Sequence, residues 1–446
     1  MTKENRQMHL NLFIQAVGHH EAAWRYSKTN PKDVMEIEYY QGLAQKAEEA
    51  KFDSIFLADT LALNNNIKFG PNVNFFEPFT LLSAIAAVTK KIGFIGTVTT
   101  TYNEPYHVAR KFASLDHISK GRVGWNIVTS ANGAEAYNFS RDSHLEHSER
   151  YSRAREFLKV TTDLWDSWQD DALTFDRENG VFADDRKIRE INHVGETFKV
   201  RGPLNIARPV QGYPVLVQAG SSEDGREFAA QHAEAIFTLQ DRLGVAQEFY
   251  SDVKGRLVKY GRKAEHLVIL PGLCPIIGKT EAEAKEKEVE LNELTSPEYG
   301  LQQLTQFLGL DLSSYPLDGP VPPLPSLEEF NDQKSKFKII LDLVEREDLT
   351  IRQLLHRMAP SRGHVIVTGT PEQIADRMEE WFMNKGCDGF NVLPPYLPGG
   401  LEEFNQYVVP ELQRRGLFRT EYTGSTLRDH LGLPRPVNEF TMLSSK

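Results

Sequence analysis

The sequence predicts an α/β fold, a single TIM-type (β/α)8 barrel with insertions that spans residues 1–446. Short apolar runs alternate with longer amphipathic segments along most of the chain. Such alternation indicates βαβ units and a parallel sheet. Eight strand–helix units can be counted, which is the number that closes a barrel, and such barrels often exceed about 250 residues as one domain.

The eight expected strands are short apolar runs, and several of them end in polar residues. They begin near residues 9, 54, 92, 123, 215, 235, 267 and 390. The segments between them carry apolar residues at spacings of three and four, which is the period of a helix. We therefore expect helices over 36–51, 79–90, 105–117, 146–168, 281–294 and 371–384. Pro371 suits the first turn of the last one.

Two segments interrupt the alternation of strands and helices. Residues 169–214 are polar, and we expect a small hairpin insertion there. Residues 297–362 contain a proline-rich connector over 319–325, flanked by expected helices around Leu341 and Leu354. A long insertion in a barrel usually shapes or covers the active site. Residues from about 417 to 446 are expected to form a C-terminal extension.

The composition limits the partners and the location of the protein. The formal net charge is −11, and no long run of Lys or Arg occurs. Nucleic acid and membrane surfaces are therefore excluded as partners, because binding to them needs a basic footprint. The two cysteines, Cys274 and Cys387, lie in apolar runs, which indicates reduced structural thiols. Without a signal core or a membrane-length apolar stretch, a cytoplasmic protein is expected.

Polar residues at the ends of the expected strands are the first candidates for a site, because barrel chemistry occurs at the C-terminal ends of strands. Residues 121–130 predict a buried strand that ends in the hydroxyl residues Thr129 and Ser130. Asp59 ends another strand after four apolar residues. A carboxylate there is either a site residue or a cap for the next segment.

A loop of small residues, Gly220, Ser221 and Ser222, joins a strand to a helix that is expected to begin near Glu223. Backbone N–H groups at a helix N-terminus attract phosphate, and small residues allow close approach. A serine at this position also fits a simple N-cap, so the motif alone supports both interpretations.

His147 and Tyr151 stand four residues apart and share one helix face, from which both can donate to an anion or pack against the barrel. The pair His144 and His147 has a spacing that a metal site could use, but the nearby glutamates lie elsewhere around the helix, and no metal is expected. A phosphate loop at Gly278 is excluded as well, because Leu273 stands where its first glycine belongs.

These segments together resemble one family. In chain order they include 57–59, 96–100, 115–122, 124–130, 147–151, 192–198, 218–222, 369–371 and 388–391. Over residues 8 to about 425 the chain is similar to bacterial-luciferase-like flavin monooxygenases. Within them it resembles the branch that contains the nitrilotriacetate, dibenzothiophene-sulfone and long-chain-alkane monooxygenases. The Gly-Trp-Asn-x-Val-Thr-Ser run over 124–130 is particular to that branch.

The resemblance implies a barrel of the bacterial-luciferase type that binds FMN as FMNH2, supplied by a separate NAD(P)H:flavin reductase. O2 adds to C4a of the flavin, and the resulting peroxyflavin transfers one oxygen atom to a small substrate. In such enzymes the cofactor carries the chemistry, and the protein positions it and excludes water. The resemblance also implies a homo-oligomer, either a dimer or a tetramer.

The family's site residues carry over only where this sequence matches its motifs. Gly220, Ser221 and Ser222 are expected to hold the FMN phosphate, with Tyr151 and His147 on the same phosphate or on the ribityl chain. The residues expected along the rest of the flavin are Asp59, Thr97, Ser130 and Ala131. His19 matches a histidine that acts near the peroxyflavin and is the expected catalytic residue, although a structural role fits it almost as well, and its neighbour His20 makes the assignment ambiguous.

Two departures from the family bear on the substrate. Ala16 and Ala131 stand where the alkane-hydroxylating members carry a cysteine and a histidine, which disfavours a long-chain alkane. We expect a small organosulfur, amine or aromatic substrate instead. Aromatic residues that could wall its pocket are Trp24, Phe75, Phe76 and Trp125, of which Trp125 fits a packing role better.

Two other functions stay open at this point. A deazaflavin-dependent oxidoreductase of the same fold would transfer hydride without oxygen. A flavin-binding protein without catalysis would retain FMN and consume no substrate.

Overall fold

Among the described residues, eight parallel strands close into a barrel in the computed structural model, which describes residues 6–63, 67–70, 75–326 and 334–444. Each strand is hydrogen-bonded in parallel to its two neighbours in the circuit. The order is β1 (His9–Ile14), β2 (Ser54–Leu57), β3 (Gly93–Thr99), β4 (Val123–Val128), β9 (Val215–Gln218), β10 (Ala235–Thr238), β11 (Val268–Ile277) and β13 (Gly389–Val392). The predicted TIM barrel and its eight strands are confirmed.

Side chains alternate between the two faces of each strand, which separates an inner core from an outer one. On β1, Leu10 and Leu12 belong to the outer core under the helices. Phe13 belongs to the inner core, where its ring centroid lies 5.2 Å from that of Phe56 and 5.5 Å from that of Phe237. The barrel interior is therefore filled, and space for a ligand is left to the loops at its mouth.

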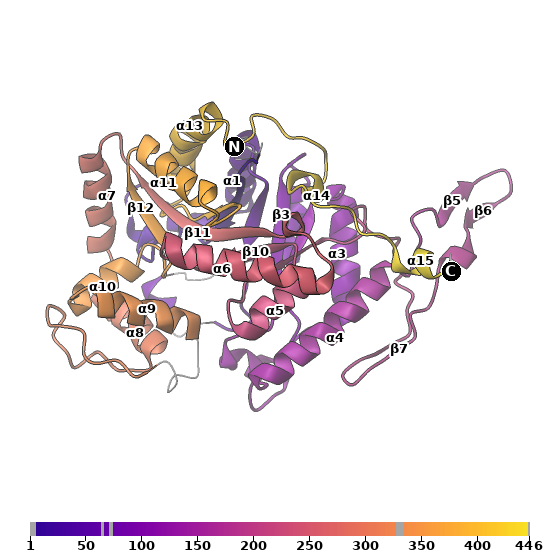
Figure 1. The fold of residues 1–446 in the computed structure, drawn as a ribbon, viewed down its shortest axis with the longest axis horizontal. Helices are drawn as coiled ribbons and strands as arrows, with labels where there is room; N and C mark the ends of the chain where they lie inside the picture. Colours follow the sequence, from indigo (N-terminus) through magenta and orange to yellow (C-terminus); the bar gives the residue numbers. More distant parts are fainter. Residues whose placement is uncertain (1–5, 64–66, 71–74, 327–333, 445–446) are drawn as a thin grey trace.

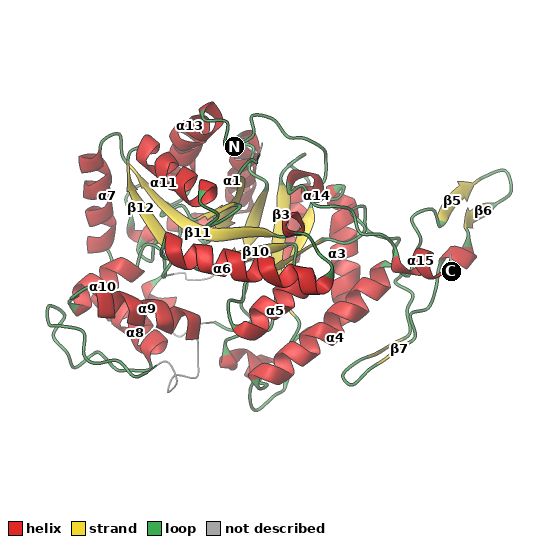
Figure 2. Cartoon of the chain, in the orientation of Figure 1, coloured by secondary structure: helices red, strands yellow, loops and turns green. Residues whose placement is uncertain are grey.

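Helices pack around the outside of the barrel (Figures 1 and 2). They follow the strands in the alternation that the sequence predicts. Those of the barrel are α1 (Ile37–Glu49), α2 (Pro78–Ala86), α3 (Pro105–Ser119), α4 (His147–Trp165), α5 (Glu223–His232), α6 (Leu243–Arg256), α7 (Glu281–Glu293), α11 (Pro371–Met383), α12 (Gly399–Glu403) and α13 (Val409–Arg414). No described helix is both long and apolar enough to cross a bilayer.

Trp125 on β4 is a core residue of this outer layer. Its side chain is fully buried, and its ring centroid lies 5.5 Å from that of Phe112 on α3 and 5.9 Å from that of Phe157 on α4. The indole Nε1 donates a hydrogen bond to the backbone oxygen of Val98 (2.9 Å). Trp125 therefore faces the helices and does not wall a substrate pocket.

The segment 169–214 contains two hairpins where the sequence predicts one. They are formed by β5 (Leu173–Asp176) with β6 (Val181–Ala183), and by β7 (His193–Val194) with β8 (Lys199–Val200). Figure 1 shows both hairpins projecting from the same side of the barrel, with β7 beside α4 and with β5 and β6 beyond α15.

The segment 297–362 forms a helical group of its own. It contains α8 (Pro297–Leu308), α9 (Lys334–Arg346) and α10 (Ile351–Met358). Their apolar faces share one cluster, which includes Leu304, Phe307, Ile340 and Leu354. The chain then returns to the barrel through β12 (Val365–Gly369), which pairs in parallel with the second half of β11.

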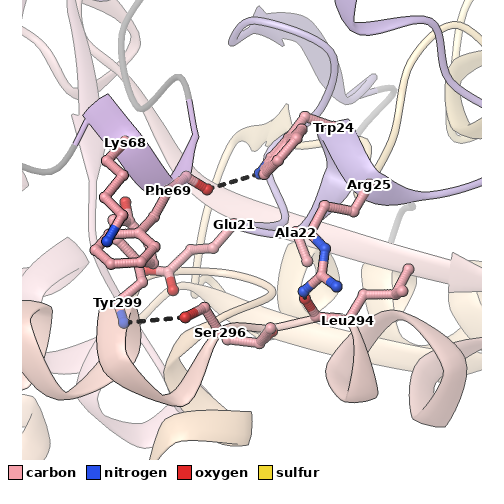
Figure 3. A pocket seen from close by; sticks show the side chains of 10 residues that line it. Glu21, Ala22, Trp24, Arg25, Lys68, Phe69, Leu294, Ser296 and Tyr299 are labelled. Carbon is pink, nitrogen blue, oxygen red and sulfur yellow. Dashed lines mark hydrogen bonds between the residues drawn. The ribbon is translucent and has the colours of Figure 1, made fainter.

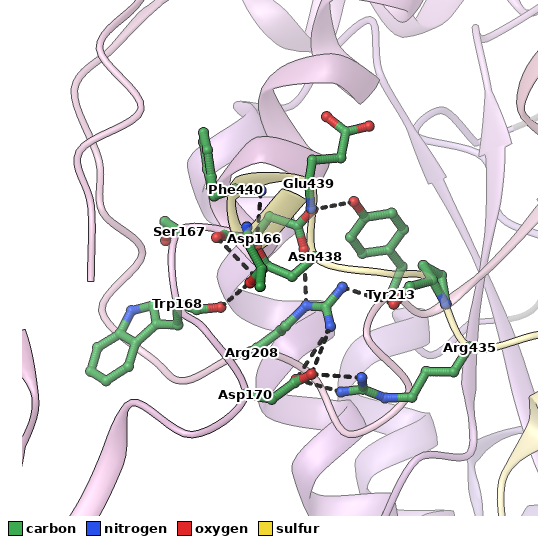
Figure 4. Close-up of polar contacts among 12 residues, drawn as sticks. Asp166, Ser167, Trp168, Asp170, Arg208, Tyr213, Arg435, Asn438, Glu439 and Phe440 are labelled. Carbon is green, nitrogen blue, oxygen red and sulfur yellow. Dashed lines mark hydrogen bonds and ion pairs between the residues drawn. The ribbon is translucent and has the colours of Figure 1, made fainter. Parts of the chain in front are cut away.

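The C-terminal extension closes the end of the barrel opposite the mouth. Leu427, in α14 (Leu427–His430), belongs to the inner core together with Leu431 and Leu433. The backbone N–H of Leu427 donates to the oxygen of Gly121, two residues before the start of β4 (3.0 Å). The last described helix, α15 (Glu439–Ser444), lies beside the end of α4, where the N–H of Glu439 donates to Asp166 (Figure 4).

Candidate active site

The loop between β9 and α5 opens at the barrel mouth. Ser222 is the N-cap of α5, and its Oγ accepts a hydrogen bond from the N–H of Gly225 (3.1 Å). A Cβ on Gly220 would lie 3.0 Å from the hydroxyl of Tyr151 and 2.4 Å from the amide nitrogen of Gln218. The loop thus passes close to Tyr151 because residue 220 has no side chain, and it leaves the positive end of a helix at the mouth.

The first two turns of α4 face this loop. Tyr151 is 7% exposed, and its hydroxyl is hydrogen-bonded to Ser222. The ring of His147 lies 4.9 Å from that of Tyr151, and its Nδ1 is 3.3 Å from a carboxylate oxygen of Asp224. Burial raises the pKa of Tyr151, so its hydroxyl keeps the proton that it can donate.

Five predicted site residues therefore form one group, which we call the α4–α5 cluster: His147, Tyr151, Gly220, Ser221 and Ser222. The structure bears on two questions that the sequence left open: whether Ser222 is an N-cap, and whether His147 and Tyr151 pack against the barrel. Ser222 does cap α5, and Tyr151 does pack, with its ring 6.2 Å from that of Phe228. His147 does not pack as a buried residue, because 51% of its side chain is exposed.

A second group lies across the ends of β2, β3 and β4. Ser130 has a φ of +55°, which is rare for a residue with a side chain. Its hydroxyl donates to Glu135 (2.5 Å) and lies 2.8 Å from that of Thr99. The other oxygen of Glu135 accepts from the hydroxyl of Thr60, next to Asp59 (2.9 Å). These two hydrogen bonds tie the loop after β2 to the loop after β4, and Glu135, which accepts both, is only 4% exposed.

Asp59 lies beside this link. Burial raises the pKa of its carboxyl to about 7, and the charges of Glu77 and Glu135 add to the rise, while a hydrogen bond from the N–H of Thr60 opposes it. The next element that the structure describes begins only at Ile67, so Asp59 does not cap a helix. Its carboxyl can gain or lose a proton near neutral pH.

Asp59→Asn is expected to change how stability depends on pH. A raised pKa means that the folded protein binds this proton more tightly than the unfolded chain does, so Asp59 costs stability increasingly between about pH 4 and about pH 7. In urea titrations, the free energy of unfolding of the variant relative to wild type should rise by about 2 kcal/mol from about pH 5 to about pH 8. Asp171→Asn, at an exposed carboxylate, is the control. A difference that is equal at both pH values would contradict the assignment.

Arg150 connects the two groups. It precedes Tyr151 on α4, and its guanidinium donates to the backbone oxygens of Thr129 (3.3 Å) and Ser130. Thr97 is buried on β3, where its hydroxyl accepts from the amide of Asn126 (2.8 Å). Ala131 is exposed directly after Ser130. The sequence motifs predicted neither Arg150 nor Glu135 as a site residue.

The neighbours His19 and His20 have different surroundings. Nδ1 of His20 accepts from the N–H of Ala22 (3.0 Å), and its Nε2 lies 3.1 Å from the amide oxygen of Asn292. Burial lowers the pKa of His20 to about 4, so this ring is a neutral structural group. The ring of His19 lies 5.4 Å from that of Phe13 in the inner core and 6.0 Å from that of His364. Of the two, His19 is the one that faces the barrel.

His144 and His147 do not act as a pair. Nδ1 of His144 is 2.6 Å from the hydroxyl of Tyr102, and its Nε2 is 3.2 Å from the oxygen of Ser130. His147 turns to Asp224 instead. In the described part of the chain, no cluster of three or more His, Cys, Asp or Glu side chains could hold a metal ion.

The barrel and the two polar groups at its mouth define a class of protein. The family model for luciferase-like monooxygenases matches residues 12–388. The chain belongs to this family and is a flavin-dependent monooxygenase.

Several individual members of this family are similar to the chain over nearly its whole length. N-acetyl-S-(2-succino)cysteine monooxygenase of Bacillus subtilis (strain 168) is 52% identical, over 99% of this chain and 100% of its own length. Component A of nitrilotriacetate monooxygenase from Aminobacter aminovorans is 50% identical, over 97% of this chain and 98% of its own. The solved structure of EDTA monooxygenase from Chelativorans sp. BNC1 superposes with a TM-score of 0.79 at 35% identity, covering 96% of this chain and 99% of that one.

Proposed function

We propose that the protein is the oxygenating component of a two-component system. It would bind FMNH2 delivered by a separate NAD(P)H:flavin reductase and use O2 to insert one oxygen atom into a small organic substrate. The observation that carries this proposal is the α4–α5 cluster, in which a helix N-terminus, two serines and a tyrosine hydroxyl converge where residue 220 has no side chain. The relative named as a component A fits a system with a second protein.

These residues fit the phosphate of FMN. The positive end of α5 and the hydroxyls of Ser222 and Tyr151 offer the donors that a phosphate needs. Gly220 lets the loop come close to Tyr151 and Gln218, because a Cβ there would collide with both side chains. Ser221 and His147 would complete the contacts.

The bound flavin would supply the activation of oxygen, and the protein's own groups would position it and manage protons. Arg150 holds the backbone of Ser130, and Glu135 holds its hydroxyl, so that this loop keeps one shape against the flavin. Asp59, whose pKa is about 7, would hold or release a proton beside the ring at neutral pH. Thr97, Ser130 and Ala131 would line the flavin, and His19 would face the reacting side.

We propose an amine or a thioether that carries several carboxylates as the substrate. Nitrilotriacetate is such an amine, and N-acetyl-S-(2-succino)cysteine is such a thioether; both appear in the names of relatives that are about half identical to this chain. A hydride-transferring deazaflavin enzyme is less well supported, because two neighbours that use F420 as coenzyme are only 13% and 12% identical, so that their likeness shows the fold alone.

A coupled assay under 18O2 tests the proposal. The protein is mixed with a flavin reductase, NADH, FMN and either nitrilotriacetate or N-acetyl-S-(2-succino)cysteine, and products are quenched with borohydride so that an aldehyde keeps its label. We expect at least one compound to be consumed, with one 18O atom in the oxygenated product of each turnover. Consumption without label would favour hydride transfer, and retention of FMN without consumption across a panel of such amines and thioethers would favour a binding protein. A reaction without reductase is the control.

A further inference from the structure

A pocket of about 250 Å³ lies beside the loop after β1, and no predicted flavin contact lines it (Figure 3). It forms where the loop after β1, the loop after β2 and the start of α8 meet. Nε1 of Trp24 donates to the backbone oxygen of Phe69 (2.8 Å), and the guanidinium of Arg25 donates to that of Leu294. Three segments that are distant in sequence are thus held around one space.

The pocket adjoins the loop that carries His19. The backbone of Ala22, which lines the pocket, donates to the ring of His20 (3.0 Å), and His19 next to it faces the barrel. A ligand in this pocket would therefore lie near the reacting side of the mouth. This position suits the end of a substrate that is remote from the oxidised atom.

The charge of the pocket favours an anion. Arg25 and Lys68 line it with one carboxylate, that of Glu21. The N-terminus of α8, a helix of 12 residues, also opens here, with Ser296 as its N-cap, and it adds partial positive charge. Figure 3 shows Lys68 and Arg25 on opposite sides of the space.

Thr295 is a second and independent sign of a ligand. It lines the pocket and is only 9% exposed, yet its buried Oγ1 has no hydrogen-bond partner among the residues that the structure describes. A buried hydroxyl without a partner costs free energy, and a bound carboxylate would accept its hydrogen.

The remaining wall is aromatic. The rings of Phe69 and Tyr299 lie 6.0 Å apart, and Trp24, one of the four aromatic residues considered for a substrate pocket, stands across from them (Figure 3). Such a wall can contact the carbon chain between the carboxylates.

We propose that this pocket binds a carboxylate of the substrate, through Lys68, Arg25, Thr295 and the N-terminus of α8. This inference rests on the proposed function, and it assigns the residues that would select a polycarboxylate over a neutral amine or thioether. Lys68 would supply most of the selectivity, because the guanidinium of Arg25 also holds Leu294.

The test needs neither flavin nor oxygen. Tricarballylate, a simple tricarboxylate, is titrated into the full-length protein by calorimetry, with the neutral triamide as the comparison ligand. Lys68→Met should raise the Kd of tricarballylate about tenfold, and Thr295→Val about threefold. Lys68→Arg should restore it to within about threefold. Lys111→Met is the matched control, because Lys111 is also exposed above a phenylalanine ring but lies on α3.

The outcomes separate this inference from the proposed function. Equal affinity of all variants for tricarballylate, or no preference over the triamide, would overturn the carboxylate pocket even if the coupled assay succeeds. Selective loss in Lys68→Met would support the pocket even if no 18O enters any product. In a working assay, Lys68→Met should raise KM and leave kcat within about twofold, since this contact is made equally before and during the reaction.

Discussion

Ser222→Asp is expected to weaken FMN binding at least about a hundredfold while changing the free energy of unfolding by less than about 0.5 kcal/mol. Aspartate caps a helix as well as serine does, so α5 should keep its N-terminus. Its charge would stand where the phosphate is proposed to bind. Two like charges about 4 Å apart repel by about 4 kcal/mol at the effective dielectric of a protein surface, which is more than a hundredfold requires.

Fluorescence quenching of FMN measures the affinity, and urea denaturation measures the stability. Thr350→Asp is the matched control, because Thr350 caps α10 in the same way outside the mouth. It should leave both values unchanged. If Ser222→Asp bound FMN within about threefold of wild type, the phosphate would have to lie elsewhere.

Arg208→Ala is expected to lower the free energy of unfolding by about 3–5 kcal/mol. The side chains of Arg208 and Asp166 are each 2% exposed, and their ion pair is 2.9 Å long (Figure 4). Asp166 also accepts from the hydroxyl of Tyr213 (2.6 Å) and from the N–H of Glu439 (2.9 Å). Removing the guanidinium would leave a buried carboxylate that joins the end of α4 to the C-terminal extension without its cation.

Arg435→Ala is the control in the same network. Arg435 pairs with Asp170, but both side chains are nearly half exposed, and exposed pairs contribute less than about 1 kcal/mol. The two variants are compared by urea denaturation at one pH. Equal losses would show that burial of the pair does not determine its contribution.

The barrel could be predicted because its strands are buried on both faces. Such strands appear in sequence as continuous apolar runs, as in 123–128 and 268–277, and the helices between them have a clear period. The second hairpin of the first insertion could not be predicted in this way. Its strands, His193–Val194 and Lys199–Val200, are two residues long and too short to show an alternation.

In the candidate site, too, residues in short sequence motifs could be predicted, and residues whose role depends on distant parts of the chain could not. The α4–α5 cluster could be predicted because its residues lie in short motifs, a loop of small residues and a pair four residues apart. Glu135 could not, since its role depends on Thr60, 75 residues earlier in the chain. His19 and His20 are alike in sequence, and it is Asn292, 272 residues after His20, that engages one of them.

A structure of the complex with FMN would show directly whether the α4–α5 cluster binds the phosphate. We expect the phosphate within about 3.2 Å of the hydroxyls of Ser222 and Tyr151. We also expect the isoalloxazine ring to extend toward Asp59 and Ser130. A phosphate bound away from the N-terminus of α5, or a ring that does not reach the ends of β2 and β4, would contradict the proposed flavin site.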